Sequence, residues 1–185
     1  YYHKWYRPDL QAIAVVGDFD VDQMEKKVKE LFSKIPTPVN PAKRENFTVN
    51  PHDEIYFVCA TDKELTQSSV SVYIKYPAPT KEEKNHQYMK NGILQSFYNT
   101  MLGQRVSELL QKGNPPFISA QAGFGGNIVR GWNTYIISTT AKPNEEAGAL
   151  EAIYRENERV KKFGFTEGEL ERAKTNMLVG LESAY

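Results

Sequence analysis

Residues 1–20 of the chain read YYHKWYRPDLQAIAVVGDFD, and they join an aromatic and polar motif to an apolar run and a helix start. The apolar run, Ala12–Val16, ends at Gly17, a pattern typical of a strand that is buried on both faces. Asp20 then stands where its carboxylate can accept from free backbone N–H groups of a first helical turn, with Gln23 at the return position of a capping box. The stretch therefore predicts a central strand that leads into a helix.

Apolar spacing predicts the next elements of the first half. After Asp20, apolar residues recur every three or four positions and predict a helix with one apolar face. They are Val21, Met24, Val28, Leu31, Phe32 and Ile35. Prolines recur over residues 36–53, which indicates an extended surface connection. Residues 55–60 are a second apolar run and predict a second strand, while residues 68–76 alternate as a third strand with one covered face.

The middle of the chain predicts a helical unit and a strand pair. Thr80 and Glu83 form a capping box before a long helical pattern, which we expect to break into two helices at Gly103. Residues 117–126 and 132–141 then predict two antiparallel strands joined by a turn rich in Gly and Asn.

The C-terminal part predicts a helix pair. The first helix covers residues 144–162 and stops at Gly164. Thr166 with Glu169 is a capping box for the second, and Phe165 with Leu170 a hydrophobic staple around it. The last helix is expected to bury Leu170, Ala173, Met177, Leu178 and Leu181. Together the elements predict an α+β fold, a mostly antiparallel sheet with helices packed on one face.

Composition excludes several classes of function. The charges of the 23 basic and 23 acidic residues cancel. The chain therefore has no positive electrostatic field to attract nucleic acid and no polybasic stripe to bind a membrane surface. No apolar run reaches the length of a membrane span. The length of 185 residues predicts a single domain. Because the sequence starts at Tyr1 and stops at Tyr185 within a helical pattern, we expect residues 1–185 to be excised from a longer chain.

Three segments in order carry a family resemblance. They are Lys4–Asp9 with the strand and Gly17–Asp20 after it, Asn99–Leu110 followed by Pro115-Pro116-Phe117, and Gly164–Lys174. In combination they resemble the non-catalytic domain of pitrilysin/insulinase-type (inverzincin) zinc metallopeptidases. The resemblance implies a domain of the insulinase and mitochondrial processing peptidase type, which braces a catalytic domain and lines part of a chamber for peptides.

The zinc motif of that family, His-x-x-Glu-His on a helix, is not in this sequence. His86 is the one histidine in a predicted helix, with Met89 where the base would stand and Lys90 where the second ligand would stand. His3 and His52 are isolated in turn-rich sequence. We therefore predict no catalytic, cofactor-binding or metal-binding residue in this chain, and the resemblance assigns zinc to the catalytic domain of a parent protein.

Other reactive or binding residues have simpler structural explanations. Cys59, the only cysteine, lies in the predicted strand 55–60 and is expected to be a buried, inert thiol. The segment Gly123–Gly126 lacks the Lys-Ser/Thr and the helix start of a phosphate loop, so we interpret it as glycines of a strand turn.

Aromatic and arginine side chains leave two alternatives open. The group Trp5, Tyr6 and Arg7 is expected to pack where the chain enters the domain, or else to contact a preceding domain. Arg105 is expected to be solvated or locally paired, the alternative being an ion pair with a substrate or domain carboxylate. Residues 115–117 stand about where the family has a substrate-facing arginine, so that role is not carried over.

The sequence thus predicts a structural, substrate-chamber domain of a zinc-dependent metalloendopeptidase that degrades peptides. Its expected partners are the catalytic domain, in the same or a partner chain, and the peptide substrate. A periplasmic location follows from the resemblance alone. The alternatives are a catalytically inactive assembly subunit of the same family and an unrelated α+β binding module.

Overall fold

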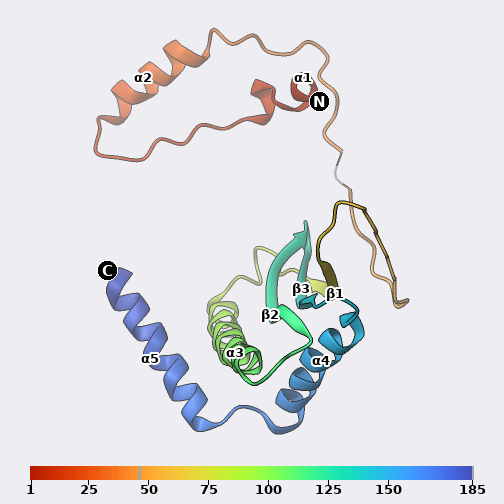
Figure 1. Ribbon diagram of the computed structural model, residues 1–185. Helices are drawn as coiled ribbons and strands as arrows, with labels where there is room; N and C mark the ends of the chain where they lie inside the picture. The colour runs from red at the N-terminus through yellow and green to blue at the C-terminus, as the bar shows by residue number, and fades with distance from the viewer. Residues whose placement is uncertain (46, 185) are drawn as a thin grey trace. The chain divides into compact units, whose positions relative to one another are not determined.

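The computed structural model describes residues 1–45 and 47–184, which fall into two compact units, Tyr1–Phe47 and Thr48–Tyr185 (Figure 1). The first unit contains α1 (Tyr2–Trp5), a 3-10 turn η1 (Pro8–Leu10) and α2 (Val21–Phe32). The second unit contains β1 (Ser68–Pro77), α3 (His86–Gln111), β2 (Phe117–Val129), β3 (Trp132–Ala141), α4 (Glu146–Phe163) and α5 (Glu167–Ala184).

The N-terminal unit confirms the predicted helix but not the predicted strand. Asp20 caps α2 by accepting a 2.8 Å hydrogen bond from the Gln23 backbone N–H. Residues 12–16 form no strand and are exposed, with Val16 96% accessible. The prediction of a central strand was wrong for a physical reason: an apolar run supplies side chains for burial, whereas a strand also needs a hydrogen-bonded neighbour. The described part of this unit contains no strand.

Arg7 organises the entry segment of the N-terminal unit. The residue is 7% exposed. Its guanidinium donates a 2.7 Å hydrogen bond from Nη2 to the Ala42 carbonyl and lies 3.2 Å from the Asp9 carboxylate. Trp5 is half-buried, while Tyr6 is 59% exposed. Of the predicted packing group, therefore, Arg7 takes the packing role and joins residues that are 35 positions apart.

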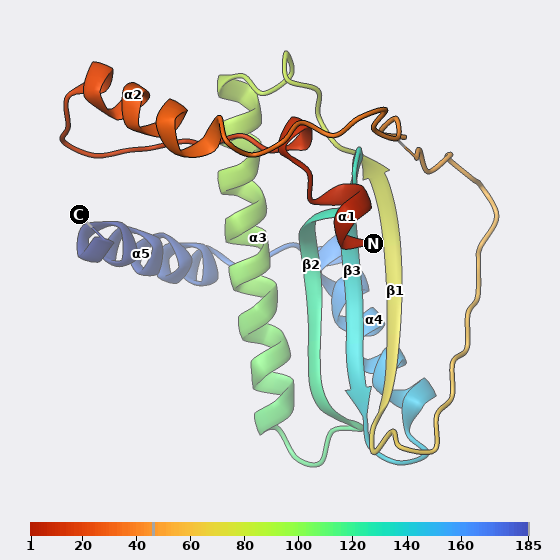
Figure 2. The same ribbon diagram turned by 90° about the horizontal axis from the view of Figure 1, so that it is seen from above.

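The second unit is built on a three-stranded antiparallel sheet in the order β1-β3-β2 (Figure 2). Ile137 of β3 stands opposite Val72 of β1 and Ala122 of β2, so these side chains share one face. The alternation predicted for residues 68–76 is confirmed as β1, and the predicted strand pair is confirmed as β2 and β3, with β2 longer than expected.

The apolar run 55–60 does not join this sheet. It forms no strand, and its side chains are exposed, with Ile55 96% and Phe57 89% accessible. As with residues 12–16, apolar composition predicted burial without supplying a partner strand. Cys59 lies in this run and is exposed, so the prediction of a buried thiol was also wrong.

The helix after β1 begins later and runs further than the sequence predicted. Thr80 and Glu83 do form their reciprocal hydrogen bonds, at 2.8 and 3.4 Å, but they close a turn, and Asn85 caps α3. The helix then continues unbroken through Gly103 to Gln111. A glycine inside a helix costs only about 1 kcal/mol relative to alanine. Burial of the neighbouring Met101 and Leu102 offsets that cost.

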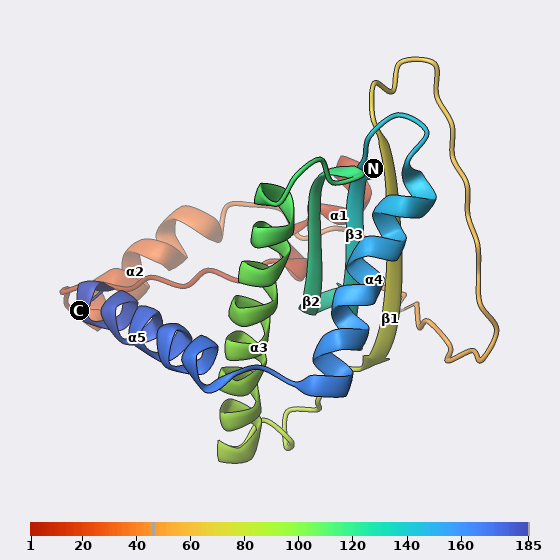
Figure 3. The same cartoon turned by 60° about the horizontal axis from the view of Figure 1, so that its bottom comes forward.

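Helices α3 and α4 pack on the same face of the sheet, and α4 runs across the strands beside α3 (Figure 3). The buried cluster between these layers consists of Leu102, Val106, Phe117, Ile137, Ala141, Ala149, Ile153 and Val160. The predicted α+β class, an antiparallel sheet with helices on one face, is confirmed.

The turn between α4 and α5 follows its predicted chemistry. Gly164 ends α4 with φ +69°, a backbone region that favours glycine. The Thr166 backbone N–H donates to the Glu169 carboxylate at 2.6 Å, and the Glu169 N–H donates to the Thr166 hydroxyl at 3.3 Å. This confirms the capping box. Phe165 has ring contacts with Tyr98 and Arg105, so it also ties the turn to α3.

The burial predicted for α5 is correct only in its first half. Ala173 is 1% exposed, whereas Leu178 and Leu181 are 59% and 63% exposed. The helix contacts α3, and no further element of the described chain has a substantial contact with it. The apolar spacing identified a helix face correctly, but nothing in the described structure covers its C-terminal half.

We expect Thr166→Ala to lower the free energy of unfolding by about 0.5–2 kcal/mol, because it leaves the Glu169 N–H without its acceptor. Urea denaturation of the 185-residue chain measures the change. Thr175→Ala is the matched control, since the Thr175 hydroxyl donates to the Glu171 carbonyl within α5 and caps no helix end. Equal losses in the two variants would contradict a specific role for the capping box.

Candidate functional site

The histidines and the cysteine are scattered in the structure. His86 is the first residue of α3 and is exposed. His52 is exposed in the connection before β1, where its Nδ1 lies 2.7 Å from the Glu54 carbonyl oxygen and its ring stacks on Tyr56. The His3 side chain lies outside the described residues. Among those that the structure describes, no group of three or more His, Cys, Asp or Glu is close enough to hold a metal ion. The absence of a metal site stays a prediction.

The glycine-rich segment lies inside β2 instead of at its end, so its interpretation as a strand turn was wrong. The Asn99 side chain of α3 bonds both backbone groups of Phe124, donating to its carbonyl and accepting from its N–H at 2.8 Å each. A Cβ on Gly123, whose φ is +154°, would overlap the Asn99 side-chain oxygen. Gly123 therefore permits α3 to close on the edge of β2, which is a structural role.

Arg105 forms the most extensive charged cluster that the structure shows. From α3 its guanidinium reaches Glu169 of α5 at 2.5 and 2.8 Å, Glu156 of α4 at 3.4 Å and the Gly164 carbonyl at 3.1 Å. The side chains are largely buried, with Arg105 16%, Glu156 4% and Glu169 12% exposed. The cluster fastens three helices together. Arg105 is therefore neither solvated nor locally paired, because its partners are carboxylates of this chain that lie 51 and 64 positions away.

The same contacts shift the ionisation of the cluster. The hydrogen bond from the Arg105 guanidinium, supported by the N–H and hydroxyl of Thr166, lowers the pKa of Glu169 to about 2. Because each of its three nitrogens bonds within the chain and its side chain is largely buried, Arg105 is not available to a substrate carboxylate. The cluster is a stabilising feature and not a candidate active site.

We expect the stability of the chain to fall as the pH decreases from about 4.5 to about 2. The folded-state pKa of Glu169 lies below its unfolded value of 4.5, so its contribution is fully present above that value and is lost toward the folded pKa. Urea denaturation across this interval measures the loss. Glu169→Gln should flatten the dependence, and an unchanged pH profile in that variant would contradict the assignment.

A series of side-chain hydrogen bonds links α3, β3 and α4. The hydroxyl oxygens of Tyr98 and Tyr135 are 2.9 Å apart. The Tyr135 hydroxyl donates in turn to the side-chain oxygen of Asn157 in α4. Phe124 packs edge-on against both tyrosine rings. Burial, together with the hydrogen bond to Tyr98, raises the pKa of Tyr135. The phenol is therefore held neutral and is a poor general base.

The opposite face of the sheet is free of helices from the second unit, and we call it the helix-free face. Its side chains alternate with those of the core in the strand register. They are mostly polar: Ser69, Ser71, Tyr73, Lys75, Ser119, Gln121, Trp132, Thr134, Ile136, Ser138 and Thr140. Ser71 and Ser138 share a 2.7 Å hydroxyl hydrogen bond across β1 and β3. This face is polar, without a nucleophile paired to a base. One end of it is covered, because the Val49 and Asn50 carbonyls accept hydrogen bonds from Trp132 and Lys75.

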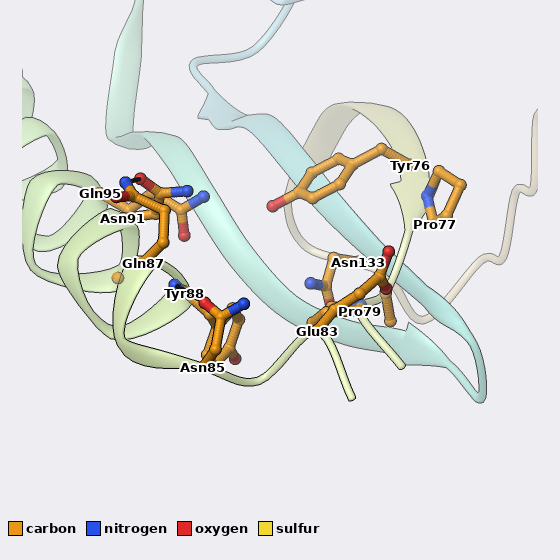
Figure 4. Close-up of a pocket in the computed structure, with 12 residues that line it drawn as sticks. Tyr76, Pro77, Pro79, Glu83, Asn85, Gln87, Tyr88, Asn91, Gln95 and Asn133 are labelled. Atoms are coloured by element: carbon orange, nitrogen blue, oxygen red, sulfur yellow. Dashed lines mark hydrogen bonds between the residues drawn. The ribbon is translucent and has the colours of Figure 1, made fainter. Parts of the chain in front are cut away.

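A cavity of about 450 Å³ lies between the end of β1 and the start of α3 (Figure 4). Amide side chains and tyrosines line most of it, and neither lysine nor arginine does. The sequence analysis missed this site. The available signal was the spacing of Gln87, Asn91 and Gln95, which places three amides on one helix face.

Comparison with known proteins places these observations in a family. Residues 1–177 match the family model described as "Peptidase M16 inactive domain". Over 184 residues the chain is 23% identical to the probable zinc protease PqqL of Escherichia coli, covering all of this chain and 19% of that protein. It is 25% identical over 186 residues to the zinc protease PQQL-like protein of Arabidopsis thaliana, of which it covers 16%. The chain thus spans less than a fifth of the length of these relatives.

Solved structures show the same fold. The crystal structure of the periplasmic protease PqqL from Escherichia coli matches 99% of this chain with a TM-score of 0.73 at 22% identity, over 20% of that chain. A predicted insulinase family protease from Yersinia pestis matches all of this chain and 40% of its own, with a TM-score of 0.66 at 19% identity.

Proposed function

The chain belongs to the peptidase M16 inactive-domain family, and from that membership we propose that it is a non-catalytic domain that lines the substrate chamber of a zinc-dependent metalloendopeptidase. In this proposal residues 1–185 act as one domain of a longer polypeptide. The catalytic domain, in the same or a partner chain, holds the zinc and the general base. This chain would support the catalytic domain and provide part of the surface that lines the substrate chamber.

The helix-free face is the observation that carries the proposal. A chamber that admits unfolded peptides of many sequences needs a wall that is polar, hydrated and without deep pockets for single side chains. Serine and threonine hydroxyls, which both donate and accept, meet that need with little side-chain entropy. The helices cover the other face, so the wall is rigid.

The relatives support the finer parts of the proposal. Proteins similar to this chain are named zinc proteases, and PqqL is described as periplasmic, from which we propose a peptide substrate and a periplasmic location. Exposed apolar side chains on α5, such as Leu178 and Leu181, give the catalytic domain a surface to pack on.

A catalytically inactive assembly subunit of the same family is the second candidate. The sequence His-x-x-Glu-His is absent from residues 1–185, as both candidates require of this domain, so it does not separate them. The two functions differ in the polypeptide around this domain: an intact zinc motif in the catalytic domain selects the peptidase, and a degenerate motif selects the assembly subunit.

Ser71→Trp in the longer protein tests the chamber assignment. We expect it to reduce turnover of a long unstructured peptide severalfold, because the indole projects from the helix-free face into the space for substrate. Ser107→Trp, the same change at an exposed position of α3, is the control and should keep parental turnover. Equal turnover in the two variants, with unchanged melting temperatures, would contradict the proposal that this face lines the chamber.

A further inference from the structure

The cavity beside α3 lies next to a second one, with which it shares lining residues, and we call the two together the amide groove. The second cavity, of about 320 Å³, shares Asn91 and Gln95 with the first and extends to Leu94, Tyr98 and Phe124. The groove follows α3 from Gln87 to Tyr98. At 1.5 Å per helical residue that is about 16 Å, which matches about five residues of extended polypeptide.

Polar groups in the groove lack internal partners. The side chains of Tyr76, Gln95 and Asn133 are half-buried, and within the described chain none of them has a hydrogen bond. Figure 4 shows the Tyr76 hydroxyl pointing into the space between β1 and α3. Half-buried polar groups normally bond to protein, water or ligand. These three come from different elements and converge on one cavity, so they offer a ready set of donors and acceptors.

The remaining amides retain bonding capacity. Gln87 donates to the Asn91 side-chain oxygen at 2.9 Å, so the Gln87 oxygen and the Asn91 amide nitrogen keep their bonding capacity. A carboxamide donates and accepts at once, as a peptide group does. Amides four residues apart on a helix are separated by about 6 Å, so they can pair with backbone groups of alternate residues of an extended chain, which repeat at about 6.6 Å.

Charge and apolar contacts define the ligand further. Glu83 is the one ionisable acid or base in the lining, so acidic side chains are disfavoured. At the other end, Leu94, Tyr98 and Phe124 offer an apolar surface, with Leu94 56% exposed. The Tyr98 and Phe124 rings pack edge-on against each other at this end.

We propose that the amide groove binds an extended, non-acidic polypeptide segment of about five residues, with its backbone along the α3 amides and an apolar side chain against Leu94 and Phe124. The groove lies on the helix side of the sheet, opposite the helix-free face. It is therefore a site outside the proposed chamber wall, and it does not depend on the chamber assignment.

NMR titration of the isotopically labelled 185-residue chain tests the proposal. The probe is an acetylated and amidated pentapeptide of serine and glycine with one terminal leucine. We expect shifts confined to the backbone amides of residues 76–98 and 124–133. Combining Gln95→Ala with Asn133→Ala should weaken binding about tenfold, since two hydrogen bonds are lost. Gln111→Ala, which removes an exposed amide at the far end of α3, should leave it unchanged.

Two further probes separate the alternatives. Exchanging the leucine of the peptide for aspartate should weaken binding about tenfold without altering the protein, so a folding defect cannot explain the result. Cellopentaose, an uncharged oligosaccharide of similar length, should not bind. No shift with the leucine peptide, equal binding by the double variant, or preferential binding of the oligosaccharide would each overturn the proposal.

Discussion

Replacing Arg105 by methionine is expected to lower the free energy of unfolding by about 3 kcal/mol, the low end of the cost of breaking a buried ion pair. The substitution removes the guanidinium that lies between Glu156 and Glu169 and leaves both carboxylates largely buried. It also removes the contact of the guanidinium with the Phe165 ring, at 4.9 Å. The loss stays near the low end because Arg159 still donates to Glu156 at 2.9 Å.

Urea denaturation of the 185-residue chain measures this effect, with Arg155→Met as the matched control. Arg155 pairs with Glu151 at 2.6 Å on the exposed side of α4, where both side chains are more than two thirds accessible. An exposed pair of this kind contributes about 0–1 kcal/mol. If the two variants lost the same stability, the burial of the Arg105 cluster would have no energetic consequence, contrary to our account.

Phe117→Ala is expected to cost about 3–5 kcal/mol, the usual range for truncating a buried phenylalanine. Phe117 opens β2, is 1% exposed and belongs to the cluster formed with Leu102 and Ile153. Truncation loses the transfer free energy of the ring and leaves a cavity between sheet and helices. The packing of α3 and α4 on the sheet depends on this cluster.

Phe163→Ala makes the same change at the end of α4, where the ring is 72% exposed. It should change the free energy of unfolding by no more than about 0.5 kcal/mol. Comparable losses in the two phenylalanine variants would show that Phe117 is not part of a packed core.

Local patterns in the sequence predicted the features that depend on neighbouring residues. The Asp20 cap, the Thr166–Glu169 capping box and the alternation of β1 all involve residues a few positions apart, and the structure contains each of them. The fold class followed from the order of such elements.

The sequence patterns did not predict which distant segments pair as strands. Residues 12–16 and 55–60 carry the apolar composition of strands, yet in the described structure neither has a strand beside it. The expected break at Gly103 failed for a related reason: local propensity disfavours glycine, but burial of the flanking residues against the sheet outweighs the preference.

The candidate sites show the same limit. A single-sequence motif search tests for metal ligands and nucleophiles, whereas the amide groove is assembled from β1, α3 and β3. Only its α3 row, at Gln87, Asn91 and Gln95, has a regular spacing along the chain. The partners Tyr76 and Asn133 become visible once the register places them opposite each other in the sheet.

The central claim, a non-catalytic domain of a zinc peptidase, is tested most directly by measuring zinc content and peptide cleavage together. The 185-residue chain is washed with chelator, reconstituted with zinc and assayed on a quenched fluorescent peptide, with the longer protein as control. Catalytic zinc needs about three protein ligands and an activated water. We predict no stoichiometric zinc and no cleavage by the chain, with chelator-sensitive cleavage by the longer protein. One tightly bound zinc per chain with chelator-sensitive turnover would contradict the claim.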